Sequence, residues 1–98
     1  MRAYEIVLKR EAIDDMDRLR KYDATEIADA MEKHLTYEPT KESRSRIKRL
    51  RGVSDPDYRL RVADYRVFYS VREPERRVDV LRVMHKDETR EYYEELER

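Results

Sequence analysis

The chain has 98 residues, 39% of them apolar and 47% charged, with 23 basic and 23 acidic side chains. This length predicts one domain, covering residues 1–98, with a single modest core. The chain has no cysteine, which excludes disulfides and cysteine-ligated metals, and no apolar run near the roughly 18–20 residues of a membrane span. We therefore expect a cytoplasmic protein that does not insert into a membrane.

The charge is unevenly distributed although its sum is zero. Residues 1–40 carry 7 basic and 10 acidic side chains, residues 41–72 carry 10 and 4, and residues 73–98 carry 6 and 9. The middle segment could present a positive field to a polyanion. Alternatively, its basic side chains are solvated and paired with acidic residues of the helices.

The first 40 residues predict one strand and two helices. Residues 4–8 are mostly apolar, as in a half-buried strand. Apolar residues spaced three and four apart then predict an amphipathic helix over residues 10–20. A second helix is expected to start at Asp23, because Asp23 and Glu26 have the spacing of a capping box. Its apolar face would contain Ile27, Ala30, Met31, His34 and Leu35.

The segment over residues 40–51 is polar and basic. Ile47 and Leu50 are three residues apart within it, which allows a helical turn. Alternation of apolar and polar residues then predicts strands. The expected strands cover residues 58–62, 65–71 and 78–84.

Short turns at Ala63-Asp64 and at residues 73–76 would join these strands into an antiparallel meander. The first strand must then join the edge of this sheet or pair in parallel with the last strand. Residues 86–98 predict a charged helix. The fold class is therefore α+β: an N-terminal strand, an αα-hairpin, a three-stranded antiparallel meander in a small, mainly antiparallel sheet, and a short C-terminal helix.

Arginine is the residue type that most suggests a function. Arg59 and Arg61 are two residues apart on one predicted strand, so they share a face, and Arg66 joins them if the hairpin register holds. Guanidinium groups bind phosphate oxygens through paired hydrogen bonds and can stabilise a phosphoryl transition state. The alternative is that these arginines simply form a solvated sheet face.

Other common sites are not indicated. One glycine is too few for a phosphate-binding glycine loop. No dense motif of histidines and carboxylates predicts a metal site, and no cofactor is expected. His34 lies on the apolar stripe of a helix, which favours a residue at the boundary of the core over a ligand.

Two sequence segments resemble the RelE/ParE superfamily of bacterial and archaeal toxins. They are residues 47–52, IKRLRG, and residues 57–71, DYRLRVADYRVFYSV. Residues 78–85 together with Tyr92 and Tyr93 extend the resemblance, which covers nearly the whole chain.

The resemblance implies the toxin of a type II toxin–antitoxin pair, with a cognate antitoxin as partner in a hetero-oligomer. The RelE-like branch, which we favour, binds the ribosome and cleaves mRNA there without a metal. In that branch the RNA 2′-hydroxyl attacks the adjacent phosphate and leaves a cyclic phosphate and a free 5′-hydroxyl. The alternatives are a ParE-like toxin that poisons gyrase, and a catalytically inactive remnant that binds only its antitoxin.

The resemblance also assigns site residues. Arg59 and Arg61 fall where many members have lysines, and Arg66 matches an arginine of the third strand. Because arginine cannot accept a proton, we expect His85 to face the arginines and transfer protons. Tyr93 would stack on a base or orient the substrate. The alternative is that His85 merely ends a strand and Tyr93 packs the helix onto the sheet. The further RNA-binding residues expected are Lys48, Arg49, Arg51, Lys86 and Tyr92.

Overall fold

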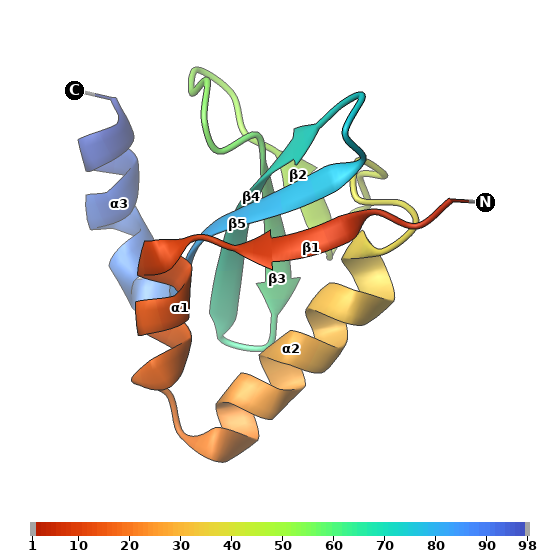
Figure 1. Ribbon diagram of the computed structural model, residues 1–98. Coiled ribbons are helices and arrows are strands. Elements are labelled where there is room, and N and C mark those ends of the chain that lie inside the picture. The colour runs from red at the N-terminus through yellow and green to blue at the C-terminus, as the bar shows by residue number, and fades with distance from the viewer. Residues whose placement is uncertain (1, 98) are drawn as a thin grey trace.

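The computed structural model describes residues 2–97 and contains one five-stranded sheet and three α-helices (Figure 1). Among these residues, no helix is long and apolar enough to cross a membrane. In chain order the elements are β1 (Glu5–Leu8), α1 (Arg10–Asp17), α2 (Lys21–Leu35), β2 (Ile47–Arg49), β3 (Tyr58–Val62), β4 (Tyr65–Arg72), β5 (Arg77–His85), the 3₁₀ turn η1 (Lys86–Glu88) and α3 (Thr89–Leu96).

The strand order is β1-β5-β4-β3-β2. β1 pairs in parallel with β5, and all other pairs are antiparallel. This topology confirms the predicted α+β class, the meander and the parallel option for the first strand. β5 lies between β1 and β4, and its apolar residues are covered on both faces, as expected of an inner strand.

The structure corrects two predictions about local structure, the start of the second helix and the conformation around Ile47. α2 begins at Lys21, and Asp23 lies in its first turn, where its carboxylate accepts a hydrogen bond from Arg20 Nε at 3.2 Å. The helical turn proposed around Ile47 is the edge strand β2 instead. Ile47 pairs with Leu60 and is buried, so its contact with β3 decides the local conformation.

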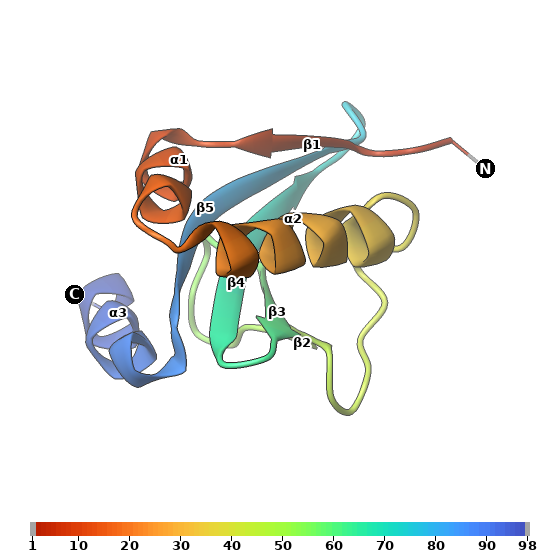
Figure 2. The same cartoon turned by 90° about the horizontal axis from the view of Figure 1, so that it is seen from below.

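The main core lies between the sheet and the two N-terminal helices. α2 crosses this face of the sheet, and α1 and α3 lie near the same end of it (Figure 2). The apolar stripe of α2 buries Ile27, Met31 and Leu35 as the periodicity predicts. The core strands contribute Tyr58, Leu60, Val62, Val67, Tyr69, Val78, Val80 and Val83.

A smaller cluster covers the opposite face of the sheet. Phe68, Met84 and Tyr92 are buried in it, and Leu50, Tyr93 and Leu96 pack against them. α3 is thus held on this second face mainly by aromatic contacts, with the ring centroids of Phe68 and Tyr92 4.8 Å apart. The helix therefore limits how much of this face remains open to a ligand.

A β-bulge in β5 changes which side chains face the main core. Tyr69 pairs with Val80 but the preceding residue, Phe68, pairs with Arg82, so Leu81 is the extra residue. Val80 and Val83 both lie in the main core, which regular alternation would not allow. Regular alternation along β5 from Val80 would place Val83 on the second face. Because of the bulge, each later residue of β5 lies on the face opposite to the one that regular alternation predicts.

Beyond the last β1 pair, Leu8 with Val80, α1 covers the edge of β5. Asp15 of α1 accepts a hydrogen bond from the backbone N–H of Val83 at 2.9 Å and one from Arg82 Nε at 2.8 Å. The buried carboxylate thus satisfies a strand-edge donor that would otherwise be unpaired.

Candidate functional site

Three arginines share the sheet face opposite α1 and α2. Arg61 of β3 pairs directly with Arg66 of β4, and Arg59 pairs with Phe68, whose side chain lies in the second-face cluster. We call the surface formed by Arg59, Arg61 and Arg66 the arginine face. The predicted hairpin register is therefore the one observed.

Within residues 2–97, the arginine face forms no ion pairs with acidic side chains. None of its three guanidinium groups forms an ion pair with a carboxylate of residues 2–97, whereas Arg72, Arg77 and Arg82 all do. Arg59 Nε is buried and has no acceptor in that part of the chain. Burial and the neighbouring charges of Arg59 and Arg61 lower the pKa of Arg66 from its ordinary value. Such a cluster favours a bound anion.

Backbone contacts orient Arg66. Its Nη1 donates hydrogen bonds to the carbonyl oxygens of Ala63 at 3.1 Å and of Tyr65 at 2.9 Å. Ala63 has φ 52° and lies in the tight turn between β3 and β4. The turn therefore fixes one nitrogen and leaves the others for a ligand.

The four predicted basic RNA-binding residues lie in different places. Lys48 pairs with Arg59 across β2 and β3, so it extends the arginine face. Arg49 is on the other face, where its Nη1 donates to Tyr58 Oη at 3.1 Å. Arg51 is exposed in the loop after β2, and Lys86 Nζ lies 3.6 Å from Asp64 Oδ1.

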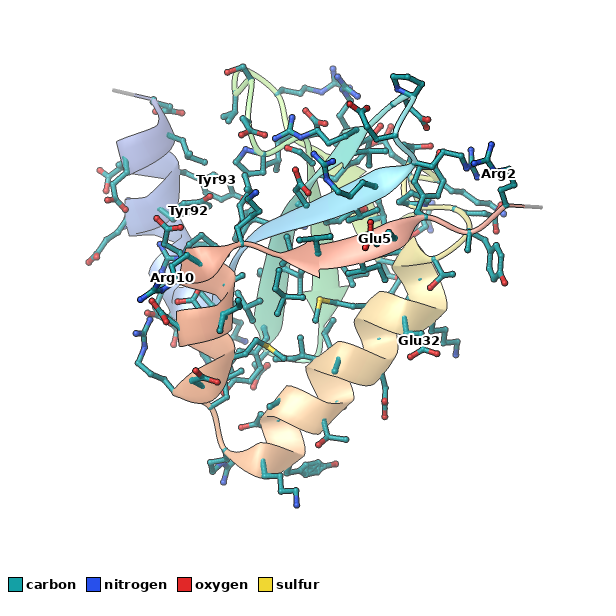
Figure 3. The ribbon with its side chains drawn as sticks, viewed as in Figure 1. Arg2, Glu5, Arg10, Glu32, Tyr92 and Tyr93 are labelled. Atoms are coloured by element: carbon teal, nitrogen blue, oxygen red, sulfur yellow. The ribbon has the colours of Figure 1, made fainter. Side chains whose placement is uncertain are left out.

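The two tyrosines of α3 differ in environment. Both project from α3 toward the sheet (Figure 3). Tyr92 is buried, and this burial raises its pKa to about 12. Tyr93 is half-buried, and its ring centroid is 5.7 Å from that of Phe68, which pairs with Arg59. Tyr93 therefore borders the arginine face, and Tyr92 packs beneath it.

His85 lies on the opposite face, so the expectation that its ring faces the arginines is wrong. Its ring centroid is 5.5 Å from that of Tyr65, whose hydroxyl donates to Asp23 of α2. His85 Nδ1 accepts a hydrogen bond from the backbone N–H of Asp87 at 3.1 Å and caps η1. The bulge in β5 is the physical reason, because it reverses the alternation of side chains before His85.

A family model described as the ParE toxin of the type II toxin–antitoxin system, parDE, matches residues 6–90. The chain belongs to this toxin family. This membership confirms the RelE/ParE superfamily that the sequence motifs indicated. A search of curated proteins finds no match.

Solved structures of RelE toxins have the same fold as this toxin. A mutant of Escherichia coli RelE in the free state has a TM-score of 0.72 and 26% identity, covering 96% of this chain and 94% of that chain. RelE in the RelE–RelB complex from Pyrococcus horikoshii OT3 has a TM-score of 0.62 and 28% identity, covering 85% and 94%. A chain of the Mycobacterium tuberculosis RelBE2 complex has a TM-score of 0.75 and 24% identity, covering 87% and 93%.

The toxin's arginine face can bind and stabilise a phosphate, but guanidinium groups cannot exchange protons at ordinary pH. Lys48 and Tyr93, which border it, carry an amine and a phenol, and both residue types serve as general acids or bases in enzymes. Sequence reasoning grouped Lys48 only with RNA binding, because its pairing with Arg59 depends on the unpredicted strand β2. No cluster of three or more metal-ligating side chains occurs within residues 2–97.

Proposed function

We propose that this toxin is a ribosome-dependent endoribonuclease whose arginine face binds the scissile phosphate of mRNA. The observation that carries the proposal is the direct pairing of Arg61 with Arg66, beside Arg59, with no carboxylate of residues 2–97 paired to any of them. Like charges directly opposite each other destabilise a sheet, so their placement favours a function that needs an anion there.

In the proposed reaction, the RNA 2′-oxygen loses its proton and bonds to the adjacent phosphorus. The bond from phosphorus to the 5′-oxygen breaks, and that oxygen takes up a proton. Arg59, Arg61 and Arg66 stabilise the additional negative charge on the phosphate oxygens. Lys48 and Tyr93 are the proposed proton-transfer groups, since His85 is on the other face, and Tyr93 also offers a ring on which a base can stack.

The proposed partners are mRNA on the ribosome and a cognate antitoxin. The antitoxin is supported by family membership and by the RelE–RelB complexes of the structurally similar toxins. An antitoxin segment that folds on binding would form a hetero-oligomer with the toxin and cover its sheet.

The test is cleavage of a defined mRNA on purified translating ribosomes, with product ends mapped by primer extension. We expect cleavage by the wild type and at least a roughly 100-fold lower rate for Arg66→Ala. Arg44→Ala, which removes an exposed charge from the loop before β2, is the matched control and should retain the rate. An intact mRNA with the wild-type toxin would contradict the proposal.

A second candidate function is poisoning of DNA gyrase, which two observations favour. The matching family is described as ParE, and His85 does not contribute to the arginine face. Purified gyrase would then accumulate double-strand breaks with the toxin, and Arg66→Ala would leave that effect unchanged. If neither mRNA cleavage nor gyrase inhibition occurs while the antitoxin still binds, the chain is an inactive remnant.

A further inference from the structure

A cleft of about 330 Å³ lies between the C-terminal turns of α2 and the segment that leads into β2. It is separate from the arginine face, because Ile47, which lines it, points into the main core. Three basic side chains line the cleft: Lys33, Lys41 and Arg46. The lining contains one carboxylate, that of Glu38, which is 3.6 Å from Lys41 Nζ.

His34 lines the same cleft as these cationic side chains. Burial and the positive charges of Arg46 and Lys33 lower the pKa of His34 from its ordinary value. Lys33 and Arg46 line the same cleft as the imidazole, although they come from α2 and from the segment before β2. Few carboxylates are available there to balance them, so the cleft attracts anions.

Arg46 and Ser43 are held in place by the backbone. Arg46 Nη1 donates to the carbonyl oxygen of Arg61 at 3.4 Å. Ser43 Oγ accepts hydrogen bonds from the backbone N–H groups of Arg46 at 3.0 Å and Ile47 at 3.3 Å. Because the hydroxyl oxygen is accepting both bonds, its own hydrogen can be donated to a ligand in the cleft.

We infer that this cleft is a second phosphate-binding site, with Lys41, Arg46 and Ser43 as the ligand-binding groups. The backbone N–H of Arg61 donates to the carbonyl of Arg46 at 2.9 Å, so the cleft and the arginine face lie on opposite sides of the same strand pair. β2 is the edge strand, and an RNA chain that crosses it would meet the cleft on one side and Lys48 on the other. The assignment of this phosphate to RNA, though not the site itself, rests on the proposed function.

The two histidines of the chain provide a direct test, because His34 lines the cleft and His85 is the internal control. The imidazole signals are followed by NMR as pH is varied, with inorganic phosphate and separately with a 2′-O-methyl oligoribonucleotide. This probe lacks the attacking hydroxyl and is not cleaved. We expect a bound phosphate to raise the pKa of His34 and to leave the His85 signal unchanged.

Variants identify the binding groups. Lys41→Ala and Arg46→Ala should each weaken binding about tenfold, as expected for a lost charge-assisted hydrogen bond. Lys21→Ala, at the other end of α2, is the matched control and should bind like the wild type. If Arg46→Ala affects folding, Lys41→Ala alone tests the inference. Lys41 is exposed, so its replacement should not disturb the fold.

The outcomes separate this inference from the proposed function. A His34 response to the oligonucleotide supports an RNA subsite, and a response to inorganic phosphate alone supports a small phosphate ligand. If His34 responds to a probe but the wild-type toxin cleaves no mRNA on ribosomes, the proposed function is overturned and the inferred phosphate-binding site still stands. No response of His34 to either probe, or an equal response in Lys41→Ala, overturns the inference.

Discussion

Arg61 and Arg66 face each other across two neighbouring antiparallel strands without a carboxylate of residues 2–97 to separate their charges. Two like charges in this position repel, and the repulsion is removed when one is neutralised. We therefore expect the pair to lower the stability of the free toxin and to increase its affinity for an anion.

Arg61→Gln should consequently separate stability from activity. We expect the free energy of unfolding to rise by roughly 0.2–1 kcal/mol because the like-charge contact is lost. Ribosomal mRNA cleavage should fall in the same variant. Urea unfolding and cleavage rates measure the two effects, and Arg44→Gln should change neither. A lower stability together with full activity would contradict the role assigned to this pair.

The C-terminal helix α3 should open more readily than the sheet. Tyr92 is its one buried residue, and Tyr93 and Leu96 are only partly covered. A helix of this length has little stability of its own in water. Hydrogen exchange should therefore be faster in α3 than in residues 67–71, and Leu96→Ala should accelerate exchange in α3 alone. Equal protection of both segments would contradict this prediction.

Asp15 should be the most sensitive acidic residue of α1. Its buried carboxylate binds the Val83 backbone N–H and the Arg82 guanidinium, so Asp15→Ala leaves both donors without their acceptor. We expect the free energy of unfolding to fall by about 3 kcal/mol. Asp14→Ala, which removes an exposed carboxylate next to it, should stay within about 0.5 kcal/mol of the wild type in urea unfolding.

Alkaline conditions should destabilise the toxin partly through Tyr92. Burial raises the pKa of Tyr92 to about 12, above its ordinary value of 10.0, so folding favours the neutral phenol. This contribution to stability is complete below pH 10 and is lost as the pH rises toward 12. Tyr92→Phe should reduce that loss by on the order of 1 kcal/mol in urea unfolding across this range. The exposed control Tyr22→Phe should show the wild-type slope, and an equal slope in Tyr92→Phe would refute the assignment.

The sequence alone determined the features that depend on local periodicity. Alternation over residues 58–62 placed Arg59 and Arg61 on one face, and the short turn at Ala63-Asp64 brought Arg66 next to them. Spacing of three and four residues likewise identified the buried stripe of α2. These features are predictable because neighbouring residues along a strand or helix fix the directions of their side chains.

Tertiary structure decided the positions of Lys48 and His85. β2 has only three residues and exists because Ile47 is buried against β3, and this pairing places Lys48 beside Arg59. The bulge in β5 comes directly after Val80, where β1 stops pairing and α1 takes over the strand edge. There Asp15 binds Val83, 68 residues away in the sequence. Local periodicity cannot reveal His85's side of the sheet, because one extra residue, accommodated by these long-range contacts, reverses the alternation.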